Sequence, residues 1–322
     1  MAKNVLGIDV SKDKLDVLLL LDGKELPGQF ANSGKGFKAL RKWLKFNGAG
    51  GGQEVHACLE STGAYSEGIA TYLYEAGFLV SVMNPLRIKS YGASKLRRNK
   101  TDKADARLIA DFCLTQEPEL WQPPSVEVKE LQAITRRIEV LAEMQQMEKN
   151  RLEMAPKQTR TSIRRMIRNI ELEIADLKQQ AKDHIDGHPG LKEQSELLRS
   201  IPGIGEKTAQ TLLSEIEFSR FDSGRSVAAH AGVTPKRGQS GTSLNKTTLS
   251  KMGNARLRKA LYFPAITANR WSLAFREFAG RLEKNGKAKK QIVCAAMRKL
   301  LHIAFGVLKN KTPFDPNVAF LC

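Results

Sequence analysis

The chain has 322 residues, 41% of them apolar, which is enough for two packed domains and excludes a disordered protein. Lys and Arg outnumber Asp and Glu by 52 to 34, a formal net charge of +18 that favours a polyanionic partner such as nucleic acid. No apolar run approaches the roughly 18 residues of a spanning helix, and the start lacks a signal pattern, so we expect a cytoplasmic protein with no membrane partner. The four cysteines lie far apart and indicate neither a zinc site nor a disulfide framework.

The first part of the chain, up to about residue 84, changes repeatedly between strand and helix patterns. Its predicted elements are the strands "VLGIDVS", "KLDVLLLLDG" and "LPGQFAN", the helix "GFKALRKWLKF", the strand "VHACLES", the helix "AYSEGIATYLYEAG" and the strand "FLVSVMN", closed by Pro85. A final helix is predicted from "TDKADARLIADF". The order β-β-β-α-β-α-β-α predicts a mixed α/β sheet flanked by helices, and it also occurs in the ribonuclease H-like fold.

A proline-rich segment, "EPELWQPPS", separates this part from two long helical patterns. Apolar or neutral residues recur there in steps of three and four, before and after Pro156: Leu131, Ile134, Ile138, Leu141, Gln145, Glu148 and Leu152, then Ile163, Ile167, Ile170, Ile174, Leu177 and Ala181. The spacing predicts two long helices, packed as a coiled-coil hairpin or against another subunit. An intramolecular bundle with no role in oligomerisation fits the same pattern.

The last part of the chain begins with "LLRSIPGIGEKTAQTLLSEI", which predicts helix, glycine turn, helix. Between Asp222 and Glu277 no acidic residue occurs, whereas ten residues are Lys or Arg, and a stretch of one charge sign favours contact with phosphate. The predicted domains are therefore an α/β domain at 1–117, a helical hairpin at 125–190 and a mainly helical domain at 195–322.

Four acidic residues stand out in the first domain. Asp102 and Asp105 lie one helical turn apart behind Thr101, a possible N-cap, and acids there ordinarily complement the helix dipole. Asp9 ends the first strand and Glu60 ends the fourth, and these strands are neighbours in the ribonuclease H-like order. Four converging carboxylates would repel one another, by about 4 kcal/mol for two charges 4 Å apart at an effective dielectric of about 20, unless cations lie between them. The pattern predicts a site for two Mg²⁺ ions that cuts phosphodiesters.

Asp13 and Asp16 are alternative ligands that we rank below Asp9, because Asp13 is in a turn and Asp16 opens the second strand. Their ordinary role would be surface solvation.

Basic and glycine residues around these motifs predict contacts to a nucleic-acid backbone. In the first domain the candidates are Arg97, Arg98, Lys100, Lys103 and Arg107. In the last domain they are Lys236, Arg237, Lys246, Lys251, Arg256 and Arg258. The amides of Gly203 and Gly205 could hold a phosphate at a helix N-terminus, although the same residues equally suit a tight interhelical turn.

Six stretches, including "GIDVSKDKLDV", "RRNKTDKADARLIADFC", "SIPGIGEKTA" and "HAGVTPKRGQSGTS", resemble the DEDD-type insertion-sequence transposases that carry an added serine domain. These are bridge-RNA-guided recombinases, with site-specific DNA invertases as relatives. The resemblance implies a domain like Holliday-junction resolvases, metal binding by Asp9, Glu60, Asp102 and Asp105, and a nucleophilic Ser240. It also implies target and donor DNA and a bridge RNA as partners, and a tetramer whose sites combine carboxylates and serine from different subunits, in a bacterial cytoplasm and at the nucleoid when active.

The role of Ser240 depends on this resemblance. A serine in a glycine-flanked basic loop could approach a phosphate, but such a loop could also contact DNA only through its backbone, and Ser243 competes for the role. The alternative function is a Mg²⁺-dependent junction nuclease that uses water, with Ser240 non-catalytic. A nucleic-acid-binding protein without catalysis is a third reading, which the four acids disfavour.

Overall fold

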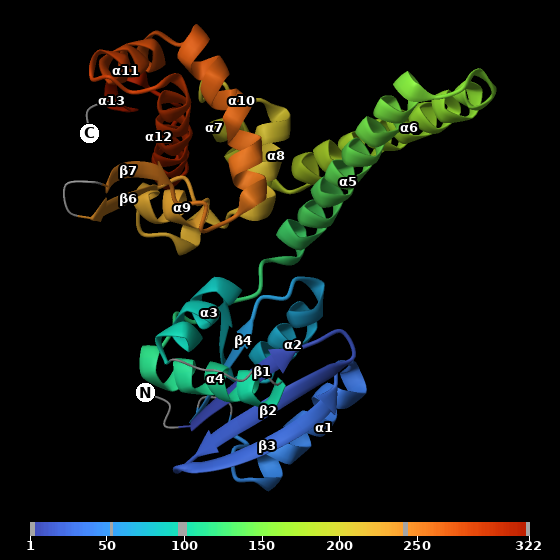
Figure 1. The fold of residues 1–322 in the computed structure, drawn as a ribbon, viewed down its shortest axis with the longest axis vertical. Coiled ribbons are helices and arrows are strands. Elements are labelled where there is room, and N and C mark those ends of the chain that lie inside the picture. Colours follow the sequence, from blue (N-terminus) through green and yellow to red (C-terminus); the bar gives the residue numbers. More distant parts are fainter. Residues whose placement is uncertain (1–3, 52–53, 96–101, 241–243, 320–322) are drawn as a thin grey trace. The chain divides into compact units, whose positions relative to one another are not determined.

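The computed structural model describes residues 4–51, 54–95, 102–240 and 244–319 (Figure 1). The chain divides into two compact units, Met1–Pro123 and Pro124–Cys322. The first unit is α/β and the second is mainly helical, as the sequence predicts. The finer division at 1–117, 125–190 and 195–322 stays a prediction.

A five-stranded mixed sheet forms the first unit. Its strands are β1 (Asn4–Val10), β2 (Lys14–Leu21), β3 (Lys24–Ala31), β4 (Val55–Glu60) and β5 (Leu79–Met83), in the order β3-β2-β1-β4-β5. β2 pairs with β1 and with β3 in antiparallel fashion, whereas β4 runs parallel to β1 and to β5. The predicted opening hairpin and the neighbouring first and fourth strands are confirmed.

Helices cover both faces of this sheet (Figure 1). On one face α1 (Gly34–Phe46) and α2 (Ala64–Glu75) pack through residues such as Leu40 and Ile69. On the other face α3 (Pro85–Ser94) and α4 (Asp102–Gln116) pack through residues such as Ile88 and Ile109. Alternate residues of β1 enter the two cores, as the period of two in a strand requires.

Helix α3 was absent from the sequence prediction, which treated Pro85 only as the end of a strand. In the structure the side chain of Asn84 accepts a hydrogen bond from the amide of Leu86, and Pro85 occupies the first helical position. Asn followed by Pro is a helix-start signal. The Asn side chain caps the first turn, and proline lacks the backbone N–H, which would have no partner within the helix at the first position.

The second unit begins with α5 (Val126–Met154) and α6 (Lys157–Gly187), two antiparallel helices joined at Pro156 (Figure 1). Gln145 hydrogen-bonds to Glu171 near the middle of the pair, and His184 contacts the carbonyl oxygen of Glu127 at the end remote from Pro156. The two predicted long helices are confirmed. Their supercoiling and their contact with another subunit stay predictions.

The remaining elements are α7 (Pro189–Arg199), α8 (Glu206–Glu215), η2 (Phe218–Arg220), α9 (Gly224–His230), β6 (Pro235–Ser240), β7 (Leu244–Leu249), α10 (Ala255–Trp271), α11 (Leu273–Lys284), α12 (Lys289–Asn310) and α13 (Pro316–Ala319). Among the described residues α12 alone is long and apolar enough to cross a membrane, a stretch that the sequence analysis did not single out. Its buried residues, such as Leu300 and Ala304, belong to the core of the helical unit.

The β6–β7 hairpin corrects the expectation of a loop around Ser240. Ser240 is the last residue of β6 and pairs with Leu244 across an antiparallel register. The strand sequences "PKRGQS" and "LNKTTL" lack the apolar alternation that marks a half-buried strand, so the pattern could not reveal a pairing that the backbone makes.

Candidate functional site

Asp9 and Glu60 lie side by side at one edge of the sheet. The parallel register of β1 and β4 pairs Ile8 with Leu59, and Asp9 and Glu60 are the next residues along the two strands. Parallel strands present their carboxyl ends at the same edge, so both half-buried carboxylates emerge there together. The register required by the predicted acid pair is therefore present.

Helix α4 brings its first turn toward the same edge. A Cβ on Gly7 would lie 2.3 Å from the carbonyl oxygen of Ala106, so the absence of a side chain lets the backbone of α4 approach β1 closely. Further along α4, the Cys113 thiol donates to the carbonyl oxygen of His56, which pairs with Val5 near the start of β1. The helix thus runs antiparallel to β1, and its N-terminal turn points toward the end of the strand that carries Asp9.

Asp9 and Glu60 also lie on the face of the sheet that α4 covers. Gly7 and Asp9 are two residues apart in β1, so both lie on the face that α4 covers, and the same holds for Cys58 and Glu60 in β4. Asp105 follows in the first turns of α4.

Three of the four predicted acids can be followed as side chains. Asp9, Glu60 and Asp105 are half-buried, and each interacts with neighbouring groups. Asp102 begins α4, but its side chain lies outside the described part of the structure. Within the described residues, no three His, Cys, Asp or Glu side chains lie close enough together to hold a metal ion.

The chemistry of the donors nevertheless fits Mg²⁺. The acids offer hard carboxylate oxygens, which this cation prefers. Thr62, two residues beyond Glu60, carries a buried hydroxyl with no hydrogen-bond partner among the described residues. A buried, unsatisfied oxygen two residues from Glu60 suits an ion or bound water better than a closed apolar core.

Asp16 is a further carboxylate that the sequence analysis undervalued. It lies opposite Asp9 in the antiparallel β1–β2 register and is only 5% exposed, so the expected role in surface solvation is wrong. Gln29 donates a hydrogen bond of 2.7 Å to its carboxylate, and Lys14 forms an ion pair with it at 3.0 Å. Asp16 and the buried Leu18 are two residues apart in "KLDVLLLL" and therefore lie on the same face of the strand. This spacing is the signal that could have predicted the burial of Asp16.

The basic residues predicted around α4 are only partly visible. Arg97, Arg98 and Lys100 lie outside the described residues, as does the side chain of Lys103. Arg107 forms an exposed ion pair with Glu25 at 2.6 Å. Lys95, at the end of α3, pairs with Asp111 at 3.1 Å, and the hydrogen bond to this carboxylate raises the pKa of the lysine.

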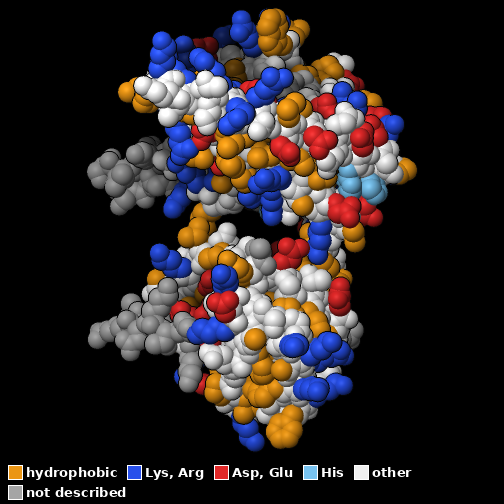
Figure 2. Space-filling model, turned by 90° about the vertical axis from the view of Figure 1, so that its right-hand side faces the viewer, with side chains coloured by type: hydrophobic (Ala, Val, Ile, Leu, Met, Phe, Trp, Pro, Cys, Tyr) orange, Lys and Arg blue, Asp and Glu red, His pale blue; other side chains and the backbone are white. Residues whose placement is uncertain are grey.

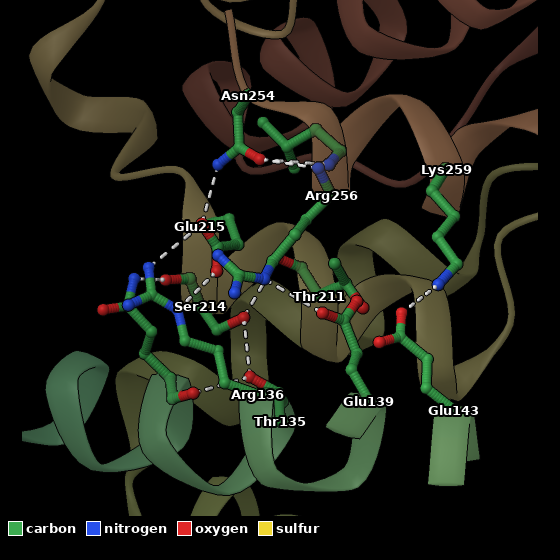
Figure 3. Close-up of polar contacts among 12 residues, drawn as sticks. Thr135, Arg136, Glu139, Glu143, Thr211, Ser214, Glu215, Asn254, Arg256 and Lys259 are labelled. Carbon is green, nitrogen blue, oxygen red and sulfur yellow. Dashed lines mark hydrogen bonds and ion pairs between the residues drawn. The ribbon is translucent and has the colours of Figure 1, made fainter. Parts of the chain in front are cut away.

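In the helical unit, acids from other helices meet part of the basic stretch (Figure 3). Glu139 of α5 pairs with Arg256 at 3.0 Å, and Glu143 of α5 pairs with Lys259 of α10, also at 3.0 Å. Glu215 of α8 accepts hydrogen bonds from Arg136 and Asn254. Two basic residues of the stretch that contains no acids therefore pair with acidic residues of α5.

Arg258 has a structural position. Its guanidinium donates to the carbonyl oxygens of Ala231 and Gly253, at 3.1 and 3.0 Å, and fixes the loop that precedes α10. Contact of Arg256 and Arg258 with nucleic acid therefore stays a prediction that has to compete with these bonds.

The glycine turn between α7 and α8 packs against α10. Gly203 has a φ of +87°, and a Cβ there would lie 2.3 Å from the carbonyl oxygen of Pro264, so glycine is required for the turn itself. Gly205 has open space around it and caps α8. The first glycine fits the structural role, and phosphate binding by the turn stays a prediction.

Of the other predicted cations, only Lys236 and Lys251 have described side chains. Lys236 is exposed on β6, and Lys251 is exposed in the loop before α10 with a φ of +56°. The side chains of Arg237, Ser240 and Lys246 lie outside the description, as does Ser243. On the face drawn in Figure 2, Lys and Arg side chains are interspersed with acidic and apolar ones over both units.

Comparison with known proteins places these features in a family context. Residues 6–159 match the IS110-type DEDD transposase model, and residues 195–280 match the transposase IS116/IS110/IS902 family. The pilin gene-inverting protein of Moraxella bovis is 34% identical over 99% of each chain, and that of Moraxella lacunata is 35% identical over 99% of each. An uncharacterized 43.6 kDa protein of insertion element IS110 from Streptomyces coelicolor is 27% identical over 43% of this chain and 34% of its own length.

Proposed function

The chain belongs to the IS116/IS110/IS902 family of transposases and is a DNA recombinase, and on this premise we propose that it exchanges DNA strands through a carboxylate site and a covalent phosphoserine. The carboxylate site comprises Asp9, Glu60, Asp102 and Asp105, and the serine is Ser240. The DNA substrate follows from the family. The residues and the covalent intermediate are the proposal.

One observation carries the assignment of the acids. The β1–β4 register sets Asp9 beside Glu60, and the close packing at Gly7 directs the first turn of α4 to the same edge. Residues distant in sequence would not share an edge and a face by composition alone. This arrangement supports a common role for the four acids.

The carboxylates would hold Mg²⁺, with two ions as the proposed count. When bound, these ions would supply Lewis acidity toward the phosphodiester. The chain's own acids would hold these ions at the sheet edge, and Asp16 with Lys14 would keep the neighbouring strand end rigid.

The proposed covalent step uses Ser240 at the end of β6. Its Oγ would form a bond to the phosphorus while the bond from phosphorus to the leaving deoxyribose oxygen breaks. The hydroxyl proton of Ser240 departs, and the freed oxygen is protonated. Attack by a second strand's hydroxyl on the phosphoserine would restore the serine, so rejoining needs no external energy source.

The wider assembly is also part of the proposal. A bridge RNA would pair with target and donor DNA, and a tetramer in the bacterial cytoplasm would combine acids of one subunit with Ser240 of another. The long α5–α6 pair supports the assembly of several subunits, because it offers an extended surface for subunit contact. The three domains at 1–117, 125–190 and 195–322 would carry the carboxylate site, assembly and the serine.

The decisive experiment is a search for a protein–DNA adduct that resists denaturant. The protein is incubated with labelled target and donor DNA, flanking-element RNA and Mg²⁺, beside Asp102→Ala, Ser240→Ala and the matched control Ser243→Ala. We expect the adduct in the wild type and in Ser243→Ala, and its loss in the other two variants. Omission of the RNA arm tests RNA guidance separately.

Cleavage without an adduct, unchanged by Ser240→Ala, would remove the serine mechanism and leave the metal-dependent junction nuclease that uses water. Binding without any Mg²⁺-dependent cleavage would remove both.

A further inference from the structure

A cavity of about 850 Å³ opens in the helical unit between the start of α9, one side of α12 and the segment before α13. Close packing creates one of its walls. A Cβ on Gly224 would lie 2.8 Å from the Cα of His302, so the glycine lets the start of α9 rest on α12. This contact places Arg225 over the same cavity that Lys299 and His302 line from α12.

The polar side of the cavity is cationic. Arg225 of α9 is exposed and Lys299 of α12 is half-buried on its wall, whereas Arg298, the residue before Lys299, lines a different cavity. Among the described residues Arg225 has no ion-pair partner. Asp315 also lines the cavity and adds one negative charge to its two cations, and its carboxylate accepts a hydrogen bond from the amide of Asn317 at 2.8 Å.

The pKa of His302 indicates a positive electrostatic potential in the cavity. Its Nε2 atom is buried and has no hydrogen-bond partner within the described chain. Burial, followed by the charges of Arg298, Lys299 and Arg225, lowers the pKa of His302 to about 4. The imidazole is therefore neutral at pH 7, in a positive potential that a bound anion would neutralise.

The opposite wall is apolar. Ile303, Val307, Pro313 and Phe314 face the same space. A cavity of this size with apolar walls and a few convergent charges is typical of small-ligand sites, and a cationic end beside an apolar end matches a phosphate joined to a nucleoside.

We propose that this cavity holds one nucleotide of a nucleic-acid strand, with its phosphate at Arg225 and Lys299 and its nucleoside against Val307 and Phe314. The inference rests on the nucleic-acid substrate of the family and not on Ser240 or the carboxylates. It adds a binding site on the helical unit to the proposed chemistry. DNA and RNA share the phosphate, so both are tested.

The test measures binding in an Asp102→Ala background, where cleavage does not interfere. Labelled single-stranded DNA and RNA are titrated into Arg225→Gln/Lys299→Gln and into the control Lys289→Gln/Lys290→Gln, which removes equal charge from the exposed start of α12. The cavity variant should lose affinity by about tenfold or more for the bound strand and lower the salt slope by about 0.7 per lost phosphate contact, the value for single strands. The control should lose clearly less.

A second readout follows His302 by NMR, with His302→Asn to assign its signal. Binding of the oligonucleotide should raise the pKa of His302 in the charge-control variant and leave it unchanged in the cavity variant. A shift with DNA or with RNA identifies the strand. Equal affinity losses in both variants, no shift at saturation, or a response to inorganic phosphate alone would overturn the proposal. Loss of adduct formation by Ser240→Ala would not alter any of these outcomes.

Discussion

At the scale of single residues, Gly7 decides how closely α4 approaches the sheet. Replacement with Ala would place a Cβ 2.3 Å from a backbone oxygen, which cannot move aside as a flexible side chain can. We expect Gly7→Ala to lower the free energy of unfolding by at least about 1–3 kcal/mol, the range for overpacked cores. Urea denaturation measures this. Gly34→Ala, which meets no atom within 4 Å, is the control and should change stability little.

Asp16 supplies a second prediction at this scale. Its carboxylate lies opposite Asp9 and adds negative charge to the sheet edge. We expect Asp16→Asn to raise the Mg²⁺ concentration needed for half-maximal cleavage and to leave cleavage detectable at saturating Mg²⁺. Asp9→Asn should abolish cleavage at every Mg²⁺ concentration. The exposed turn residue Asp13 provides the control variant Asp13→Asn. A Mg²⁺ dependence identical to wild type in Asp16→Asn would assign Asp16 to structure alone.

His302 predicts a dependence of stability on pH. Its pKa is lowered from 6.5 to about 4 in the folded chain, so between these values the unfolded chain binds more protons than the folded one. The free energy of unfolding should therefore fall as the pH falls through this window. Thermal unfolding at pH 7 and pH 4.5 measures the loss. In His302→Gln the loss should be smaller, and an undiminished loss would assign it to other groups.

At the scale of elements, polar contacts join α5 to α8 and α10 (Figure 3). The Lys259–Glu143 pair is exposed at both ends, with 68% and 66% of the side chains accessible, whereas the Glu215 side chain beside Arg136 is only 5% accessible. Lys259→Met should cost about 0–1 kcal/mol, as surface pairs do. Arg136→Met should cost about 1–3 kcal/mol, because it removes a hydrogen bond from a buried charge. Equal unfolding free energies for the two variants would contradict this.

The helices and strands differ in how far they could be predicted. α5 and α6 were found because apolar or neutral residues recur along them in steps of three and four, and the five strands of the sheet were found because local pattern and burial agree there. α3 was missed although Asn84 and Pro85 encode its start. The β6–β7 hairpin was missed because its strands lack the alternation of apolar and polar residues from which a strand is predicted.

At the scale of the whole molecule, the two units have separate cores. The buried clusters of the sheet unit and of the helical unit share no residue, and Trp121 donates its amide to Val80 within the first unit at 2.6 Å. We expect a fragment of residues 1–123 to fold alone and to unfold cooperatively in urea, which circular dichroism can follow. A fragment without a cooperative transition would mean that the first core needs the helical unit.

The sequence by itself determined the mixed α/β sheet and the long helical pair, because these follow from periodicities, and it predicted Asp9 and Glu60 at the ends of neighbouring strands. The tertiary structure alone decided which elements share that edge of the sheet. The β1–β4 register and the contact at Gly7 direct Asp9, Glu60 and the first turn of α4 to one edge, and the antiparallel β1–β2 register places Asp16 opposite Asp9. Only the fold pairs Arg256 and Lys259 with acids of α5 and sets Arg225 beside His302. Contacts between residues distant in the chain depend on packing and register, which no local pattern encodes.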